Sequence, residues 1–264
     1  MQSQQRIILS VEHLQKSFGP KEVLRDVTFT AAAGEFVCIV GPSGAGKTTL
    51  LRALAQLGPA DGGRVLLDGR EVTEPPSEMA VVFQDYSRSL MPWMRVAANV
   101  ELPLLRSRLS KAERSERIQQ ALVDVGLPDA GRLYPWQMSG GMQQRVAIAR
   151  SLAYRPEVLI MDEPFASVDA QTRADLEDLM LDLRDRLGVT IVLVTHDIDE
   201  SVYLSDKVIV LSGSPATVTA TVPVPLGAPR DQIATKATPE FLALRAEIHG
   251  LIAHAGARPV TVSS

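Results

Sequence analysis

The chain has 264 residues, a length that suits one α/β domain with an inserted or appended piece. Its 45% hydrophobic and 22% charged residues are ordinary for a soluble globular protein, and a net charge of −4 gives no sign of a polyanion-binding surface. The single cysteine, Cys38, excludes an intramolecular disulfide and favours a reducing compartment. No stretch reaches the roughly 18 apolar residues of a transmembrane helix. We therefore expect a soluble protein, recruited by a partner to any membrane at which it works.

The first part of the chain predicts strands followed by a helix. Residues 7–18 and 24–31 alternate in polarity, as half-buried antiparallel strands do. Residues 35–40 form a continuous apolar run, which indicates a strand buried on both faces, with Cys38 as a structural thiol. Residues 47–57 follow as a helix with leucines on one side, and residues 79–84 predict a strand that ends at Gln84.

A mainly helical segment comes next, from Asp85 to residue 156. Ser110 and Glu113 form a capping box that opens one helix, which ends at Gly126. A second helix begins after Gly141. The segment interrupts a β/α alternation, so we interpret it as an inserted subdomain.

The strand pattern returns after the insertion. Apolar runs at residues 157–163, 189–196 and 207–212 alternate with helices and predict a parallel sheet with crossover helices. We expect a core of residues 1–84 and 157–215, a helical subdomain of residues 85–156, and a short C-terminal extension with a helix in residues 216–264. That last helix is predicted to open at Thr238-Pro239.

A phosphate-binding loop lies between the strand ending at Val40 and the helix that follows. The sequence G-x-x-x-x-G-K-[ST] is complete here, and the strand–loop–helix context is what this motif requires. Lys47 is expected to reach the β- and γ-phosphates of a nucleotide and the Thr48 hydroxyl to bind Mg²⁺. The predicted ATP-binding residues of this loop are Gly41, Pro42, Ser43, Gly44, Ala45, Gly46, Lys47, Thr48 and Thr49.

Four polar residues at strand ends complete the predicted site. Three of them, Glu163, His196 and Gln84, are expected to be catalytic together with Lys47. Asp162 follows four apolar residues and is expected to help hold Mg²⁺, while Glu163 is free to activate water as a general base. His196 ends a later strand, where a γ-phosphate would lie, although a structural histidine that caps the strand is the alternative. Gln84 ends the strand from which the helical insertion departs, so it is placed to sense phosphate and the insertion together.

The order of these motifs resembles that of the ATP-binding cassette (ABC) ATPases. The resemblance covers about Ile8 to Leu211 and includes Ser139-Gly140-Gly141-Met142-Gln143 at the place of the signature motif. It implies a cassette fold with a RecA-like parallel-sheet core, an N-terminal antiparallel β-subdomain and the inserted helical subdomain. It also implies that the signature binds the γ-phosphate of an ATP held by a second subunit. A serine hydroxyl, glycine amides and a helix N-terminus suit that phosphate, and two-fold pairing would bury two ATPs.

Further site residues follow from the same resemblance. Phe18 corresponds to the aromatic residue that stacks on adenine, with a core aromatic as the alternative. Asp169, in Ser167-Val168-Asp169, belongs to a loop that acts in trans. Gln84 is implied as a further Mg²⁺ ligand. Met138 and Met142 depart from the residues most common in the signature, and the latter variation is one we associate with importers.

The segment Leu90-Met91-Pro92-Trp93 resembles the sequence after the strand-end glutamine in the nitrate/sulfonate/taurine importer group. Apolar side chains on a loop indicate a partner surface, and the resemblance implies contact with a permease here. Packing of Trp93 inside the helical subdomain is the alternative.

These features predict the ATP-hydrolysing, energy-coupling subunit of an importer for a small, anionic solute. We expect a homodimer, two integral membrane permease subunits, a solute-binding protein as an indirect partner and no nucleic acid. The expected cofactors are ATP and Mg²⁺, and the expected place is the cytoplasmic face of a bacterial inner membrane, as a peripheral subunit. The alternatives are the ATPase of a two-gene exporter or lipoprotein-release system, or a non-transport ABC ATPase. The sequence leaves the solute open.

Overall fold

The computed structural model describes residues 6–84 and 89–256, which divide into two compact units. The first unit comprises the described residues of Met1–Glu74 and Val192–Ser264, and the second those of Pro75–Ile191. The start of the predicted helical insertion, Asp85–Arg88, lies outside the described residues. The domain boundaries inferred from the sequence stay a prediction.

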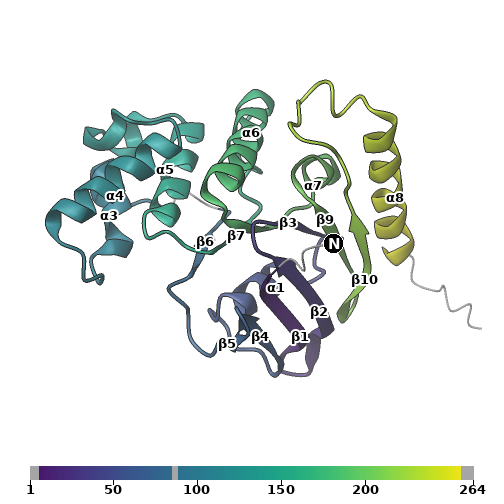
Figure 1. Cartoon of the computed structure of the whole chain (residues 1–264). Helices are drawn as coiled ribbons and strands as arrows, with labels where there is room; N and C mark the ends of the chain where they lie inside the picture. The colour runs from purple at the N-terminus through teal and green to yellow at the C-terminus, as the bar shows by residue number, and fades with distance from the viewer. Residues whose placement is uncertain (1–5, 85–88, 257–264) are drawn as a thin grey trace, which may run out of the picture. The chain divides into compact units, whose positions relative to one another are not determined.

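The first unit is built on a mixed sheet (Figure 1). Its strands are β1 (Ile7–Phe18), β2 (Lys21–Ala32), β3 (Phe36–Val40), β4 (Gly62–Leu67), β5 (Arg70–Glu71), β9 (Lys207–Gly213), β10 (Ala216–Pro223) and the end of β8 (Thr190–Val194). The strands follow one another in the order β5-β4-β1-β2-β10-β9-β3-β8. β1 pairs antiparallel with β2 and β4, which confirms the predicted antiparallel strands, whereas β3 pairs parallel with β9.

Strand β3 leads into the phosphate-binding loop and is buried throughout. Its continuous apolar sequence is what burial on both faces requires. Cys38 lies at its centre, and burial raises the pKa of its thiol well above the usual value. The predicted structural thiol is therefore confirmed.

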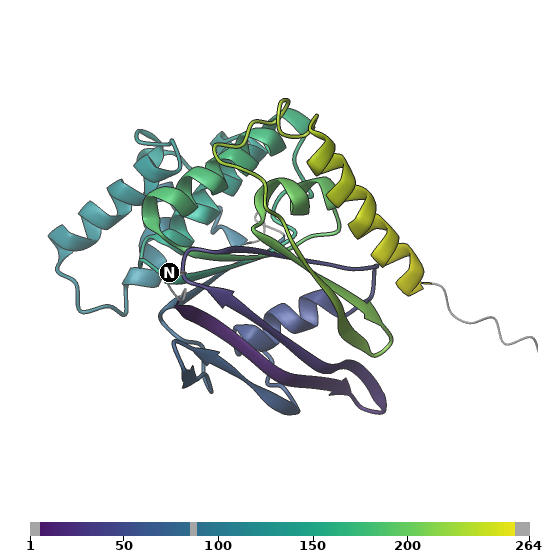
Figure 2. The same cartoon turned by 45° about the vertical axis from the view of Figure 1, so that its right-hand side comes forward.

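Three helices pack in the first unit: α1 (Lys47–Leu54), α7 (Ile198–Leu204) and α8 (Pro239–Gly256). α8 packs on α7 and β9 (Figure 2). The predicted opening of α8 is confirmed, because the Thr238 hydroxyl accepts a hydrogen bond from the Phe241 amide at 3.2 Å. α1 is shorter than predicted: Gln56 adopts a left-handed backbone with φ of 54°, which ends the helix before Leu57 and leaves that side chain exposed.

The second unit combines two parallel strands with helices. Its elements are β6 (Met79–Val82), α3 (Val96–Glu101), η1 (Leu102–Leu104), α4 (Lys111–Asp124), η2 (Ala130–Arg132), η3 (Pro135–Gln137), α5 (Gly140–Leu152), β7 (Val158–Asp162) and α6 (Ala170–Leu187). β6 pairs parallel with β7, with Met79 opposite Val158. The pairing stops at Val82, so β6 ends two residues before Gln84 and not at it.

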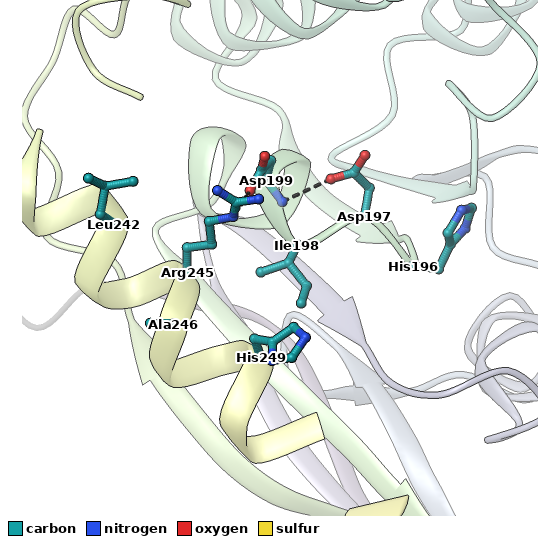
Figure 3. Close-up of a pocket in the computed structure, with 8 residues that line it drawn as sticks. All are labelled: His196, Asp197, Ile198, Asp199, Leu242, Arg245, Ala246 and His249. Atoms are coloured by element: carbon teal, nitrogen blue, oxygen red, sulfur yellow. Dashed lines mark hydrogen bonds and ion pairs between the residues drawn. The ribbon is translucent and has the colours of Figure 1, made fainter. Parts of the chain in front are cut away.

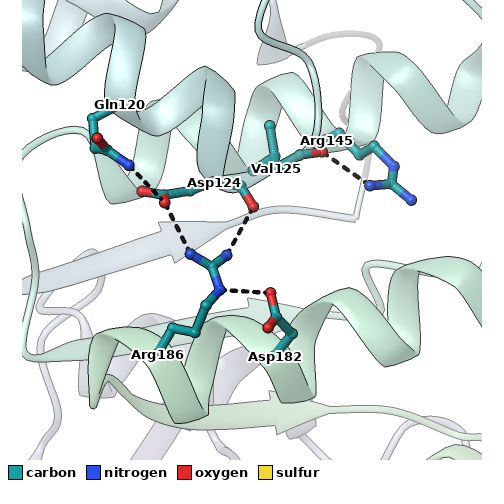
Figure 4. A network of polar contacts seen from close by, with 6 residues as sticks. All are labelled: Gln120, Asp124, Val125, Arg145, Asp182 and Arg186. Atoms are coloured by element: carbon teal, nitrogen blue, oxygen red, sulfur yellow. Dashed lines mark hydrogen bonds and ion pairs between the residues drawn. The ribbon is translucent and has the colours of Figure 1, made fainter.

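Hydrogen bonds tie the helices of the second unit together (Figure 4). Arg186 of α6 donates to the Asp124 carboxylate and to the Asp124 carbonyl of α4, both at 3.1 Å, and to Asp182 at 2.8 Å. Arg145 of α5 donates to the carbonyl of Val125 at 2.9 Å. The C-terminal end of α4 is therefore held by two other helices.

The predicted capping box of α4 is also present. The Ser110 hydroxyl accepts from the Glu113 amide at 3.3 Å, and the Glu113 carboxylate accepts from the Ser110 amide at 2.7 Å. Two amides at the start of the helix are thus satisfied by side chains.

Across residues 6–84 and 89–256, none of the helices is both long enough and apolar enough to span a membrane.

Candidate functional site

The phosphate-binding loop connects buried β3 to the N-terminus of α1. Gly46 has a φ of 76°, and a Cβ there would lie 2.8 Å from Cγ1 of Val23. Glycine is therefore required at this position both by the backbone and by space. α1 begins without a side-chain cap and has no acidic residue in its first turn, so its amides are suited to an anion.

Lys47 is the buried cation of this loop. Its ammonium donates to the carbonyl of Gly41 at 2.8 Å and to that of Pro42 at 3.2 Å. Thr48, the next residue, is exposed. The loop thus combines a held ammonium group, a helix N-terminus without a side-chain cap and an exposed threonine. This is the chemistry that a nucleotide phosphate with Mg²⁺ needs.

Phe18 ends β1 with 60% of its surface exposed. The ammonium of Lys16 lies 5.5 Å from its ring centroid. The alternative of a core aromatic is therefore wrong, and the ring is available to stack on a flat ligand.

The acidic pair lies at the end of β7. Asp162 is buried, the last residue of a strand whose five residues are all buried. Glu163 is only partly buried and adopts a left-handed backbone with φ of 43°, which is uncommon for a residue other than glycine and is typical of active sites. Gln84 donates from Nε2 to Oε2 of Glu163 across 3.4 Å. The structure thus brings Gln84 and Glu163 together within the second unit.

His196 is exposed on the turn between β8 and α7, two residues beyond the strand end. Thr195 anchors this turn, because its amide donates to the Ile39 carbonyl at 3.1 Å and its hydroxyl to Glu200 at 2.6 Å. Asp197 caps α7 by accepting from the Glu200 amide at 3.2 Å. Sequence reasoning missed these anchors, although the spacing of Asp197 and Glu200 is that of a helix cap and its third residue.

A groove of about 720 Å³ lies beside His196, between α7 and α8 (Figure 3). Arg245 of α8 pairs with Asp199 of α7 across 2.7 Å at this groove. His249 lines it from the next turn of α8. The C-terminal helix therefore packs against α7, the helix that follows the turn with His196.

The predicted signature opens α5. Ser139 is the N-cap, and its hydroxyl accepts from the Met142 amide at 3.3 Å. Ser139 and Gly140 are exposed, and the first turn contains no acidic residue. Met138 is buried, as a residue that fills space would be. The N-terminus of α5 is thus a surface with free helix amides, which favours anions.

Asp169 opens α6. Its carboxylate accepts from the amide of Thr172 at 3.0 Å and from the Thr172 hydroxyl at 2.7 Å, and these hydrogen bonds hold the pKa of Asp169 below its usual value. Thr172 also contacts Gly141. The two segments predicted to act in trans therefore meet at Thr172, a residue that the sequence did not single out.

The predicted permease-contact segment is partly buried and partly exposed. Trp93 is 74% exposed, so its packing inside the helical subdomain is wrong. Leu90 is 1% exposed and belongs to the core. Its predicted contact with a permease is therefore wrong, because a buried side chain cannot reach a partner. Pro92 is exposed and Met91 is partly exposed, which leaves these two residues with Trp93 on the surface.

Asn99 of α3 holds this segment in shape. Its buried amide accepts from the Met91 amide at 2.7 Å and donates to the carbonyls of Met91, Met94 and Arg95 at 3.1–3.2 Å. A polar residue inside the apolar sequence of α3 was the signal that could have indicated it.

The expected Mg²⁺ ligands are compatible with that ion. In the part of the chain that the structure describes, no three His, Cys, Asp or Glu side chains gather as a metal site would require. Thr48, Gln84 and Asp162 offer oxygen ligands, the type that Mg²⁺ takes together with substrate phosphates. These residue types therefore fit a metal that is held jointly with a nucleotide.

A glycine-rich loop between a buried strand and a helix, together with an acidic pair after another buried strand, defines a P-loop nucleotide-binding protein. Residues 24–166 match the family model described as ABC transporter. The chain belongs to this family as an ABC transporter ATP-binding protein, an ATPase coupled to transport.

The chain is similar to curated ATP-binding proteins that are named for import. The chain is 47% identical over 223 residues to the aliphatic sulfonates import ATP-binding protein SsuB 1 of Xanthomonas axonopodis pv. citri, covering 84% of this chain and 88% of the relative. It is 40% identical to the nitrate import ATP-binding protein NrtD of Synechococcus elongatus, covering 87% and 84%. It is 39% identical to the taurine import ATP-binding protein TauB of Escherichia coli O157:H7, covering 90% and 94%.

Solved structures share the fold. The structure of cbiO1 from Clostridium perfringens, part of the ABC transporter complex cbiONQ, has a TM-score of 0.76 and 28% identity over 83% of this chain and 89% of that chain. The cassette MJ0796, a dimer in a post-hydrolysis state bound to ADP and phosphate, has a TM-score of 0.70 and 31% identity over 82% and 99%. The predicted cassette fold is therefore confirmed.

Proposed function

We propose that this ATPase powers the import of a small anionic solute across the inner membrane of a bacterium. The observation that carries the proposal is 39–47% identity, over most of the chain, to proteins named for the import of sulfonates, nitrate and taurine. All three solutes carry an oxyanion group of sulfur or nitrogen. The ATPase itself does not contact the solute in this proposal, so the solute is chosen by the permease and by a solute-binding protein.

The nucleotide is held by the phosphate-binding loop. The ammonium of Lys47 leaves the carbonyls of Gly41 and Pro42 and binds the β- and γ-phosphate oxygens. Phe18 stacks on the adenine ring, for which its exposed side chain is available. Thr48, Asp162 and Gln84 would hold Mg²⁺, which would neutralise phosphate charge.

Hydrolysis is assigned to Glu163 as the general base that activates water. Its carboxylate is only partly buried and accepts a hydrogen bond from Gln84, which positions it. His196 contacts the γ-phosphate from the turn anchored by Thr195. Attack of water on the γ-phosphorus, with ADP as the leaving group, requires these groups to be held before the reaction. Gln84 holds the Glu163 carboxylate, and Thr195 anchors the turn of His196.

A second copy of the chain completes each site. Ser139, Gly140, Gly141 and Met142 at the N-terminus of α5, with Asp169 at the start of α6, meet the nucleotide bound by the partner. The free amides of α5 and the dimeric structure of the similar cassette MJ0796 support this arrangement. Closure around ATP and reopening after hydrolysis then drive the transport step.

Two permease subunits dock on the surface formed by Met91, Pro92 and Trp93. A large exposed indole on a rigid loop is typical of a residue that dominates a binding interface. This docking places the homodimer at the cytoplasmic face of the membrane as a peripheral subunit.

Reconstitution tests the proposed function. The chain, the permease that co-purifies with it and the matching solute-binding protein are placed in liposomes, and ATP hydrolysis is measured with a sulfonate, taurine, nitrate, a neutral sugar or an amine. Stimulation and uptake with one of the first three are expected. Stimulation by the sugar or the amine alone, or transport in the outward direction, would show that the solute class or the direction is wrong.

A further inference from the structure

At the contact between Gly141 and Thr172, one methyl group leaves no room for a side chain at position 141. A Cβ built on Gly141 would overlap the Cγ2 methyl of Thr172, whereas it would lie 3.7 Å from Cβ and 3.8 Å from Oγ1 of that residue. The last two distances are ordinary van der Waals contacts. The methyl group of Thr172 is therefore the atom that excludes a side chain at position 141.

The backbone does not itself require glycine at this position. Gly141 lies in the first turn of α5 and is not among the described residues with positive φ. Alanine could adopt such a helical backbone, and its intrinsic helix propensity is higher. The demand for glycine thus comes from what packs against it.

Thr172 cannot simply turn its methyl group away. Its hydroxyl donates to Asp169 at 2.7 Å, in addition to the bond from its amide to the same carboxylate. Rotation about χ1 by one staggered step moves the hydroxyl and the methyl together, so relief of the clash breaks the bond to Asp169. The hydrogen bonds to Asp169 at the start of α6 therefore fix the Thr172 side chain. Its methyl group then contacts Gly141 at the start of α5.

We propose that Thr172 is a positioning residue that sets the spacing between the signature at the start of α5 and Asp169 at the start of α6. This inference rests on the proposed function, in which both segments meet the nucleotide of a partner subunit. A threonine supplies what the position needs: a hydroxyl that orients Asp169 and a methyl group that fits against the bare Cα of Gly141. Serine supplies only the hydroxyl, and valine lacks it while retaining the branch.

A double-mutant cycle in the full-length chain tests the proposal. The variants are Gly141→Ala, Thr172→Ser and Thr172→Val, alone and with Gly141→Ala, each measured for ATP turnover, ATP-dependent dimerisation and monomer ATP affinity. We expect Gly141→Ala to lower turnover and dimerisation about tenfold or more, because overpacked contacts are relieved only by displacement of the two helix starts. Thr172→Ser should restore both in the Gly141→Ala background, and Thr172→Val should not.

Thr172→Val alone distinguishes a positioning role from a purely structural one, because turnover and monomer ATP affinity should respond differently. It should lower turnover and dimerisation while leaving monomer ATP affinity unchanged, because the phosphate-binding loop is not altered. Equal impairment of Gly141→Ala with and without Thr172→Ser, or normal turnover of Gly141→Ala alone, would overturn the proposal. If Gly141→Ala is insoluble, Thr172→Ser must restore a folded protein, and its failure to do so overturns the proposal equally.

Ser139→Arg separates this inference from the proposed function, because Ser139 accepts from Met142 whereas Thr172 donates to Asp169. If Ser139→Arg still dimerises and turns over ATP, the trans role of the signature fails. If Ser139→Arg is inactive but the cycle shows no rescue, only the role of Thr172 fails.

Discussion

Gln84 donates a hydrogen bond from Nε2 to Oε2 of Glu163 across 3.4 Å, although the two residues are 79 positions apart. Their roles were inferred separately, one as a sensor between phosphate and the helical segment and the other as a general base. Their contact means that a change in the position of the Gln84 side chain should alter the surroundings of the Glu163 carboxylate. If Glu163 is the general base as proposed, this hydrogen bond gives Gln84 a direct influence on hydrolysis within the second unit.

Glu163→Gln should bind ATP and dimerise but fail to turn over. The amide keeps the size of the side chain and cannot accept the proton from water, so turnover should fall by about 10²–10⁴-fold. Steady-state phosphate release and light scattering with ATP check the two halves of this expectation. Glu74→Gln, which removes an equal charge from an exposed position, is the control and should behave as wild type. Unchanged turnover in Glu163→Gln would remove this residue as the base.

Ser139→Arg should leave ATP binding by the monomer intact and prevent ATP-dependent dimers. A long cation at the start of α5 occupies the place of the partner's phosphate and also removes a helix cap. Ser110→Arg is the matched control, because Ser110 caps α4 in the same unit and is not assigned to the interface. Both variants should lose about 1 kcal/mol of stability through the lost cap, but only Ser139→Arg should lose the dimer. A loss of ATP binding by the Ser139→Arg monomer would contradict the trans role.

Substitution by alanine should affect permease binding at Trp93 and stability at Leu90. Trp93→Ala should leave the melting temperature unchanged and weaken permease binding, because the indole is exposed. Leu90→Ala should lower the free energy of unfolding by about 2–5 kcal/mol, because it leaves a cavity in the core. Thermal unfolding of the isolated chain and co-purification with the permease measure these effects. Normal permease binding by Trp93→Ala would remove this surface from the interface.

Tyr154 should make the fold sensitive to alkali. Burial raises the pKa of its phenol from 10.0 to about 12, and the hydroxyl donates to the Met79 carbonyl at 3.0 Å. Since the folded-state pKa is the higher one, the stabilisation is complete below pH 10 and is lost as the pH rises towards 12. The loss should approach about 3 kcal/mol relative to Tyr154→Phe. Urea unfolding of both proteins from pH 8 to 12 checks this, and parallel pH profiles for the two would contradict it.

Gln144→Met should raise the melting temperature. The Gln144 side chain is fully buried in α5, and neither its amide nitrogen nor its oxygen has a hydrogen-bond partner among the described residues. An unsatisfied buried amide costs about 1–3 kcal/mol, and methionine has a similar volume. The neighbouring Gln143→Met is the control, because Gln143 donates to the Met138 carbonyl at 3.1 Å and should lose stability. A lower melting temperature for Gln144→Met would show that the amide is hydrogen-bonded in solution.

The local features of this fold could be predicted because local sequence determines them. The buried strand before Gly41 and the capping box at Ser110 depend on residues that are neighbours in the chain, and both are confirmed. The length of α1 was wrong because the left-handed turn at Gln56 has no glycine or proline to indicate it. Strand ends at Gln84 and His196 were placed two residues too late, because β6 ends at Val82 and β8 at Val194 while the extended sequence pattern runs on.

Prediction of the site was least reliable where the direction of a side chain determines whether it is buried or exposed. Leu90 and Trp93 look equally apolar in the sequence, yet only packing against the rest of the helical segment sets which one is covered. Thr172 could not be identified, because its contact with Gly141 joins two helix starts that are distant in the sequence. The assigned roles of Lys47, Glu163 and Ser139 stay predictions that the experiments above address.

The hydrogen bonds of Asn99 to Met91, Met94 and Arg95 fix the loop before α3 from within the segment. Burial of Leu90 and the bond from the Val96 amide to the Leu133 carbonyl at 2.8 Å attach this loop to the rest of the second unit. If the permease docks on Met91, Pro92 and Trp93 as proposed, exchanging residues 90–99 as a block between related ATPases should transfer the choice of permease along with it.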